Sequence, residues 1–211
     1  MSNFASFDFE RALLSKGYSN IVGIDEVGRG AAVSSVVAGA VHIPVDKVSL
    51  YINKLKDSKK LSQKRREELY DLIQEHCIVA FEGVDEKIID SINILNATKQ
   101  AMTGALAKLL EKNNETDYVL IDGPVYINSF GIEQQQIIGG DALCLSIAAA
   151  SIIAKVVRDN IIMGLHNIYP NYHWDSNKGY LTKSHIEALS LYGPTEFHRL
   201  SYNKVINDKN K

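Results

Sequence analysis

Residues 21–30 read IVGIDEVGRG, and the architecture of this chain is most easily deduced from that segment. The segment from Ile21 to Asp25 is typical of a short strand of the buried type. Its last residue, Asp25, and the next, Glu26, are acids, and glycines at positions 28 and 30 then permit a turn. The segment therefore predicts a buried strand that ends in carboxylates at the edge of a sheet.

The segments that follow alternate between strand and helix patterns. Residues 33–43 are rich in Val and Ala and predict a second strand that forms a hairpin with the first. Ser62 precedes an amphipathic stretch, which predicts an N-capped helix. Further strands are expected over 77–83, 118–122 and 135–138, and helices over two stretches of 85–112, over 146–165 with its small Ala and Ser residues, and after the glycine-bearing loop at 177–182. This order fits an α/β layer fold with a mixed sheet.

The composition is that of one globular, enzyme-sized domain. The chain has 211 residues, 45% of them hydrophobic, and no repeat or linker divides it, so we expect a single domain over residues 1–211. Cys77 and Cys144 lie far apart, which argues against a disulfide framework and against a cysteine-built zinc site. No apolar run approaches the ~18 residues of a membrane span, and the first residues lack an apolar signal core. We therefore expect a cytoplasmic protein with no membrane association.

The net charge of −2 conceals an uneven distribution of basic residues. Residues 54–66 read KLKDSKKLSQKRR, a run of bases interrupted by a single acid, Asp57. Such a run can be the solvated start of a helix or a surface that binds phosphates. The run alone leaves both interpretations open.

Three segments place an acid beside glycine at the end of a strand or before a helix: IVGIDEVG with Asp25 and Glu26, YVLIDG with Asp122, and IIGGD with Asp141. Any one of them could be a turn or helix cap. Several carboxylates on neighbouring strand ends instead indicate a site, because open α/β sheets bind ligands there. Magnesium prefers oxygen ligands, and paired divalent ions promote phosphoryl displacement.

The adjacency of Asp25 and Glu26 sets a condition on such a site. Neighbouring strand residues point to opposite faces, so both acids can serve one site only if the strand breaks there, as Gly28 would allow. A two-carboxylate glycosidase would also use such acids. It would not account for the basic run.

The segment DEVGRG, residues 25–30, closely resembles the signature of the type 2 ribonucleases H, the bacterial ribonuclease HII group. The likeness continues in the family's order, over about residues 20 to 205, through DSKKLS (57–62), YVLIDG (118–123), GGD (139–141), SIAAASIIAKVVRD (146–159), NKGYLT (177–182) and the residues His198, Arg199 and Ser201. The resemblance implies a ribonuclease H-like fold, with a mixed five-stranded sheet flanked by helices and a C-terminal helical part.

The resemblance also implies an activity. It is metal-dependent endonucleolytic hydrolysis of the RNA strand of RNA–DNA hybrids, together with incision of duplex DNA 5′ of embedded ribonucleotides. The products carry a 3′-hydroxyl and a 5′-phosphate. The residues implied to bind Mg²⁺ or Mn²⁺ are Asp25, Glu26, Asp122 and Asp141. In this mechanism one ion activates the attacking water and the other stabilises the leaving 3′-oxygen.

Substrate contacts are implied at the matching positions. Backbone groups of Gly28, Arg29 and Gly30 would read the 2′-hydroxyl, which distinguishes RNA from DNA. Tyr180 would pack on the sugar at the RNA-to-DNA junction. The residues implied to contact phosphates are Lys59, Lys60, Lys155 and Arg158.

Two departures from the family pattern affect the substrate side. Residues 31–35 read AAVSS, where many relatives carry Pro and Gly, and Gly140 stands where many carry Lys. No carboxylate is lost, so we expect the protein to be active. We also expect it to be a monomer. A noncatalytic nucleic-acid-binding domain and a different nuclease, such as a junction resolvase, are the competing hypotheses. Neither would need a reader of the 2′-hydroxyl.

Overall fold

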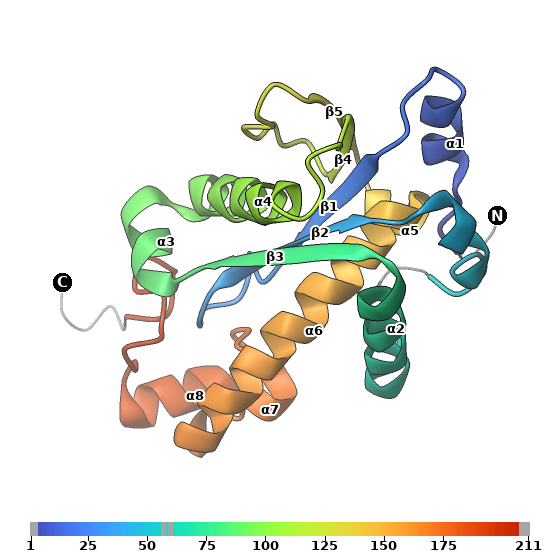
Figure 1. Cartoon of the computed structure of the whole chain (residues 1–211). Coiled ribbons are helices and arrows are strands. Elements are labelled where there is room, and N and C mark those ends of the chain that lie inside the picture. The colour runs from blue at the N-terminus through green and yellow to red at the C-terminus, as the bar shows by residue number, and fades with distance from the viewer. Residues whose placement is uncertain (1–3, 56–57, 59–60, 207–211) are drawn as a thin grey trace.

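A mixed sheet of five strands forms the centre of the computed structural model, which describes residues 4–55, 58 and 61–206 (Figure 1). The strand order is β3-β2-β1-β4-β5. The strands are β1 (Ile21–Val27), β2 (Val36–His42), β3 (Ile78–Val84), β4 (Tyr118–Asp122) and β5 (Glu133–Ile137). β1, β2 and β3 pair antiparallel, whereas β4 and β5 run parallel to β1. The predicted mixed sheet is confirmed.

Helices cover both faces of this sheet (Figure 1). The apolar residues of α4 pack with Val22 and Ile24 of β1 on one face, and α6 packs with Val41 of β2 on the other. The helices are α1 (Asp8–Leu14), α2 (Gln63–His76), α3 (Glu86–Ile92), α4 (Ile94–Leu110), α5 (Gly140–Leu143), α6 (Leu145–Ile168), α7 (Trp174–Asn177) and α8 (Lys183–Tyr192), with 3₁₀ turns η1 (Val45–Leu50) and η3 (Pro170–Tyr172).

The predicted strands and helices lie where the sequence pattern places them, with shifted ends, whereas α1, α5, α7 and the two 3₁₀ turns were not predicted. Ser62 caps α2 by accepting a hydrogen bond from the amide of Arg65, as predicted. β1 extends two residues beyond the predicted end, and β5 begins two residues before its predicted start. In the described part of the chain, no helix combines the length and apolar character that crossing a bilayer requires.

The α6 backbone lies directly on the sheet. A Cβ at Gly23 would be 2.2 Å from the carbonyl carbon of Ser146, and one at Gly39 would be 2.5 Å from the carbonyl oxygen of Ala150. Glycines on the strands and small residues on the helix therefore permit the close contact. The buried carboxylate of Glu10 in α1 fixes the start of the helix by accepting a hydrogen bond from the Ser146 amide at 2.8 Å.

A buried hydrogen-bond network holds the C-terminal helical part together. Trp174 Nε1 donates to His185 Nε2 at 3.1 Å, and His185 Nδ1 lies 3.0 Å from the carbonyl oxygen of Tyr180. His185 therefore carries its proton on Nδ1, so His198 Nε2 must be the donor in the 3.1 Å contact between the two rings. His198 Nδ1 then accepts from the Thr195 amide. Both imidazoles are neutral in this arrangement.

Because both histidines are buried and neutral, we expect the protein to lose stability in acid. Burial and the neighbouring His185 lower the pKa of His198 to about 4, and burial lowers the pKa of His185. The unfolded chain takes up these protons near pH 6.5, so the free energy of unfolding falls as the pH drops from about 6.5 to about 4. For His198 the change amounts to about 3 kcal/mol.

Urea unfolding at pH 7 and pH 4.5 measures this loss, compared between the wild type and His198→Gln. His76→Gln, at the half-buried end of α2, is the matched control and should keep the wild-type difference. An equal acid effect in His198→Gln and in the wild type would contradict the assignment.

Candidate active site

Two parallel strands bring the acids of two sequence motifs to one edge of the sheet. β1 and β4 pair in register through Ile24 and Ile121, so Asp25 and Asp122 are the next residues on each strand. Asp25, Glu26 and Asp122 each offer a carboxylate oxygen, and these atoms lie within 4.8 Å of one another. This is the spacing in which several oxygens can hold one divalent cation.

The strand does not break between the two adjacent acids. The pairing of β1 with β2 continues through Glu26 and Val27, so the expected break at the acids is wrong. Asp25 shares the face of Gly23, where α6 packs, and Glu26 belongs to the α4 face. Because β4 ends at Asp122, no strand lies beside Glu26 on that side, and its longer side chain reaches the same point.

The surroundings of Asp25 and Glu26 disfavour the ionised forms of these two side chains. Burial, followed by the negative charges of Glu26 and Asp122, raises the pKa of Asp25 well above its usual range. Burial also raises the pKa of Glu26, against the opposing effect of Arg29, whose guanidinium lies 3.2 Å from it. A divalent cation would offset this repulsion, so the donor set fits such an ion.

Asp122 and Asp141 are linked through the start of α5. The Gly140 amide donates to Asp122 Oδ1 at 2.6 Å, and Asp141 is the following residue. The negative charge of Asp141 contributes to the raised pKa of Asp25, which places it near the site. The 4.8 Å cluster found among the described residues comprises the other three acids, so the role of Asp141 as a ligand stays a prediction.

Two buried serines connect the acids to the basic run. Ser151 of α6 donates a hydrogen bond that lowers the pKa of Asp25, and its hydroxyl lies 3.0 Å from that of Ser58. Arg66 fixes the same loop by donating to the carbonyl oxygens of Ser58 and Leu61. No sequence pattern indicated a role for either serine in the site. The predicted phosphate contacts Lys59 and Lys60 lie outside the described residues.

The GRG loop and Tyr180 come together beside the acids. Gly28 has a φ of +93°, a conformation that favours glycine. Arg29 and Gly30 are exposed, and a Cβ at Gly30 would lie 3.6 Å from Cε1 of the Tyr180 ring. Tyr180 is 39% exposed, so part of its ring is available to a ligand.

The structure corrects one of the predicted phosphate contacts. Arg158 is fully buried, and its guanidinium donates to the carbonyl oxygens of Val33, Ser35 and Lys178. The sequence pattern shows a cation but not its burial, and a phosphate cannot reach this one. Lys155 forms a 2.8 Å ion pair with Asp159 and keeps 13% of its side chain exposed, so its phosphate contact stays a prediction.

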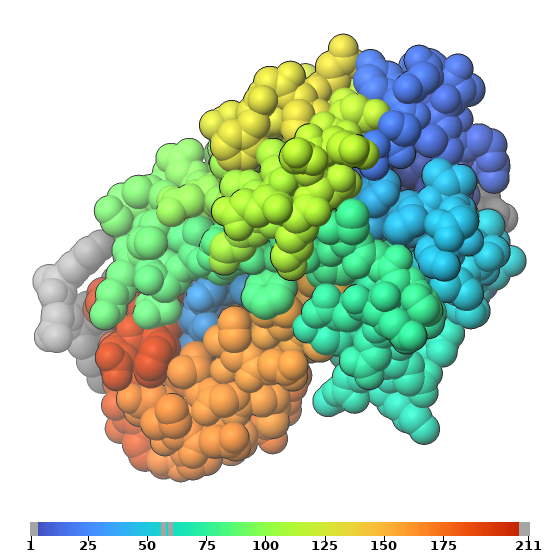
Figure 2. Space-filling view, in the orientation of Figure 1, coloured from blue at the N-terminus to red at the C-terminus, as the bar shows by residue number. Residues whose placement is uncertain are grey.

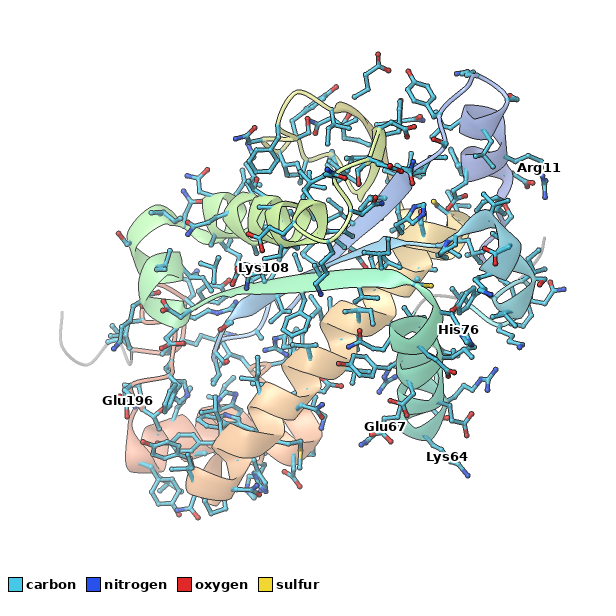
Figure 3. All side chains as sticks on the ribbon, viewed as in Figure 1. Arg11, Lys64, Glu67, His76, Lys108 and Glu196 are labelled. Atoms are coloured by element: carbon cyan, nitrogen blue, oxygen red, sulfur yellow. The ribbon has the colours of Figure 1, made fainter. Side chains whose placement is uncertain are left out.

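A groove runs between α2 and α6 on one side of the molecule. It is lined by Arg66, Asp159, Met163 and Lys178, among others, and Figure 2 shows the hollow between the two helices. Lys64 and Glu67 project from the first turns of α2 (Figure 3). The groove therefore brings together Arg66 of α2, which also contacts the loop that carries Ser58, and Lys178, which follows α7.

Comparisons with known proteins agree on one family. A family model described as Ribonuclease HII matches residues 22–205. The ribonuclease HII of Alkaliphilus oremlandii is 45% identical over 206 residues, covering 95% of this chain and 99% of its own. That of Bacillus subtilis is 44% identical over 198 residues, covering 93% of this chain and 74% of its own.

Solved structures have the same fold. A complex of PCNA with ribonuclease HII from Archaeoglobus fulgidus matches with a TM-score of 0.71 and 25% identity, covering 87% of this chain and 95% of that one. The ribonuclease H2 of Pyrococcus horikoshii OT3 matches with a TM-score of 0.74 and 24% identity, covering 88% of this chain and 95% of that one. The predicted ribonuclease H-like fold is thereby confirmed.

Proposed function

We propose, because this chain belongs to the ribonuclease HII family, that its acidic cluster is the catalytic centre of an endonuclease acting at ribonucleotides in duplex nucleic acid. The chain is a ribonuclease H, as the family match over residues 22–205 and the relatives at 45% and 44% identity show. The observation that carries the proposal is the meeting of Asp25, Glu26 and Asp122 within 4.8 Å. Neither a noncatalytic binding domain nor a junction resolvase accounts for this family match.

In this proposal Asp25, Glu26 and Asp122 would hold the divalent cations, with Asp141 as the fourth ligand. The chemistry that Mg²⁺ or Mn²⁺ would supply here is charge stabilisation at the phosphoryl oxygens and activation of a water. The chain contributes the geometry: Arg29 holds Glu26 through the 3.2 Å ion pair, and Ser151 orients the Asp25 carboxylate. Preorganised groups of this kind need no rearrangement during the reaction.

The GRG loop and Tyr180 supply recognition of the ribonucleotide. Arg29 and Gly30 are exposed next to the acids, so their backbone groups can contact a 2′-hydroxyl there. The half-exposed Tyr180 ring offers an apolar surface to the adjoining sugar. Lys155 and the basic run between residues 54 and 66 would contact the phosphates on either side.

The cellular setting and the domain organisation are also part of the proposal. We propose a monomer that acts in the cytoplasm and in which residues 1–211 form one domain. The free thiols of Cys77 and Cys144 support a reducing compartment. The single sheet through which the described elements pack supports one domain.

Incision of a DNA duplex that carries one ribonucleotide tests the proposed function. The duplex is incubated with Mg²⁺, Mn²⁺ or EDTA, beside an all-DNA duplex of the same sequence. We expect metal-dependent cutting on the 5′ side of the ribonucleotide and none of the control. Cutting of long RNA–DNA hybrids alone would refute the proposed junction recognition, and the absence of cutting with either metal would refute the catalytic assignment.

Tyr180→Ala should weaken cleavage at a single ribonucleotide more than cleavage of a long hybrid. The loss of one stacking ring costs about 1–3 kcal/mol, so we expect kcat/KM on the single-ribonucleotide duplex to fall by about 5-fold to 150-fold. A long hybrid offers a ribose at every position, so its kcat/KM should fall less. Tyr180→Phe keeps the ring and should retain most of the activity. Equal losses on both substrates would contradict junction recognition by Tyr180.

A further inference from the structure

Two buried arginines lie beneath the GRG loop without a carboxylate partner. Arg158 of α6 and Arg199 of the C-terminal segment are both 0% exposed. The ion pairs of the described residues include neither of them, although burying a cation without a counter-charge is costly. Their positive charges must therefore be balanced by dipoles of the chain.

Backbone carbonyl groups of residues 28–35 provide those dipoles. Arg199 Nη1 donates to the carbonyl oxygen of Gly28 at 2.8 Å and to that of Arg29 at 3.1 Å, and its Nε donates to that of Ser34 at 2.8 Å. Arg158 donates hydrogen bonds to the carbonyl oxygens of Ser35 and Val33, both at 3.3 Å. The loop therefore turns its carbonyl groups inward, toward the two guanidinium groups.

Glycines make room for this arrangement. A Cβ at Gly28 would lie 2.2 Å from Nε of Arg158, so a larger residue there would displace the guanidinium. A Cβ at Gly179, whose φ is +82°, would lie 3.5 Å from Nη2 of Arg158. Arg158 Nη1 donates to the carbonyl oxygen of Lys178, and its guanidinium carbon lies 5.9 Å from the centre of the Tyr180 ring. Arg158 thus ties the GRG loop to the loop that carries Tyr180.

The hydroxyl group of Tyr202 also fixes the exposed part of the loop through hydrogen bonds. Its hydroxyl donates to the carbonyl oxygen of Arg29 at 2.5 Å and accepts from Arg199 Nη1 at 3.0 Å. The carbonyl oxygens of Gly28 and Arg29 accept hydrogen bonds from within the protein. The exposed residues Arg29 and Gly30 can therefore offer their amide N–H groups to a ligand. A ribose 2′-hydroxyl can accept such a hydrogen bond, and a deoxyribose offers no atom there.

We propose that Arg158 and Arg199 are positioning residues that set how strictly the enzyme requires a 2′-hydroxyl, by fixing the backbone of the GRG loop. This inference rests on the proposed function and adds the residues responsible for its selectivity. Arginine is required because its planar fork donates in several fixed directions, whereas a lysine ammonium cannot span Ser34, Gly28 and Arg29 at once. Burial lowers the pKa of Arg158 to about 10, so its charge persists at neutral pH.

The test compares binding of two duplexes that differ in one 2′-hydroxyl. Fluorescence anisotropy in Ca²⁺ gives the Kd for a DNA duplex with one ribonucleotide and for the all-DNA duplex. The ratio of the two Kd values is the selectivity. Arg199→Lys should reduce this ratio by about 10-fold, the equivalent of one hydrogen bond to a charged group, and Arg158→Lys should act in the same direction. Calorimetric titration should give the wild-type affinity for Mn²⁺, because neither arginine contacts the acids.

Milder variants keep the test independent of folding. Tyr202→Phe removes only one hydroxyl and should reduce the ratio by about threefold. Tyr51→Phe is the matched control, because its hydroxyl also donates to a carbonyl oxygen, that of Leu72, but far from the loop. It should leave the ratio unchanged.

Each outcome has a distinct meaning. An unchanged ratio in folded Arg199→Lys and Tyr202→Phe would overturn the inference, and so would an equal reduction in Tyr51→Phe. If Arg199→Lys does not fold, the result for Tyr202→Phe decides. A wild-type enzyme without any preference for the ribonucleotide would instead refute the proposed recognition, and this inference with it.

Discussion

Asp25→Asn is expected to reduce cleavage by about 10³-fold while making the metal-free protein more stable. The substitution removes one charge from the acidic cluster, and with it a ligand for the cation that balances the cluster. We expect kcat to fall by about 10³-fold, the upper end of the cost of removing one electrostatic group from an active site. Asp122→Asn should cause a similar loss, because its carboxylate belongs to the same 4.8 Å cluster.

The gain in stability follows from the raised pKa of Asp25. Its carboxyl group is buried beside two other acids, so ionisation opposes folding. In the wild type, the free energy of unfolding falls as the pH rises from the unfolded-state pKa of about 3.9 through the raised pKa of the folded state. An asparagine does not ionise, so the advantage of the variant in EDTA should grow across that range. Each kcal/mol should raise Tm by about 2–4 °C.

Cleavage assays and thermal unfolding in EDTA at pH 5 and pH 8 measure the two effects. Asp71→Asn, on the exposed face of α2, is the matched control and should change neither activity nor stability. Mn²⁺ should raise the Tm of the wild type and have little effect on that of Asp25→Asn. A variant with wild-type activity, or one less stable than the wild type in EDTA, would contradict the assignment of Asp25.

Local patterns were sufficient to predict the five strands, the longer helices and the pairing of the first two strands. The apolar run before Asp25 and the Val- and Ala-rich segment after it predict a buried hairpin, and Ser62 has the side chain that caps a helix. β5 was harder to delimit, because it reads EQQQI and lies at the edge of the sheet, where one polar face is tolerated.

The acids were also predictable, because parallel strands end at the same edge of a sheet. Asp25 and Asp122 follow apolar strands, and the pairing of β1 with β4 brings them together. We expected Asp25 and Glu26 to reach one site only if their strand were broken. Both carboxylates reach it because the neighbouring strand β4 ends at Asp122, and a sequence pattern does not show where a neighbouring strand ends.

Contacts across long sequence distances could not be predicted. Arg199 binds the carbonyl groups of Gly28 and Arg29, and Glu10 caps a helix that begins at Leu145. Nothing in the composition around these residues distinguishes a buried arginine or glutamate from an exposed one. For the same reason Arg158 was assigned to phosphate binding, although it holds the backbone of the loop that would contact the substrate.

Gly23→Ala should destabilise the protein more than an ordinary core substitution. The added Cβ would lie 2.2 Å from the carbonyl carbon of Ser146, 2.4 Å from the amide nitrogen of Ile147 and 2.6 Å from the Ser146 carbonyl oxygen. All three are backbone atoms of α6, so no side-chain rotation can relieve the clash and the helix must move. Overpacking usually costs about 1–3 kcal/mol, and we expect at least about 4 kcal/mol here, a fall in Tm of about 10 °C.

Movement of α6 should reach the active site as well, because Gly23 and Asp25 share the face on which that helix lies and Ser151 of the helix orients Asp25. We therefore expect folded Gly23→Ala at low temperature to bind Mn²⁺ more weakly than the wild type, as calorimetric titration would show. Gly164→Ala is the matched control, since it adds a Cβ to α6 where no atom lies within 4 Å, and it should stabilise the protein by about 0.5–1 kcal/mol. If Gly23→Ala were as stable as Gly164→Ala, the close contact between α6 and β1 could not be what holds the helix against the acids.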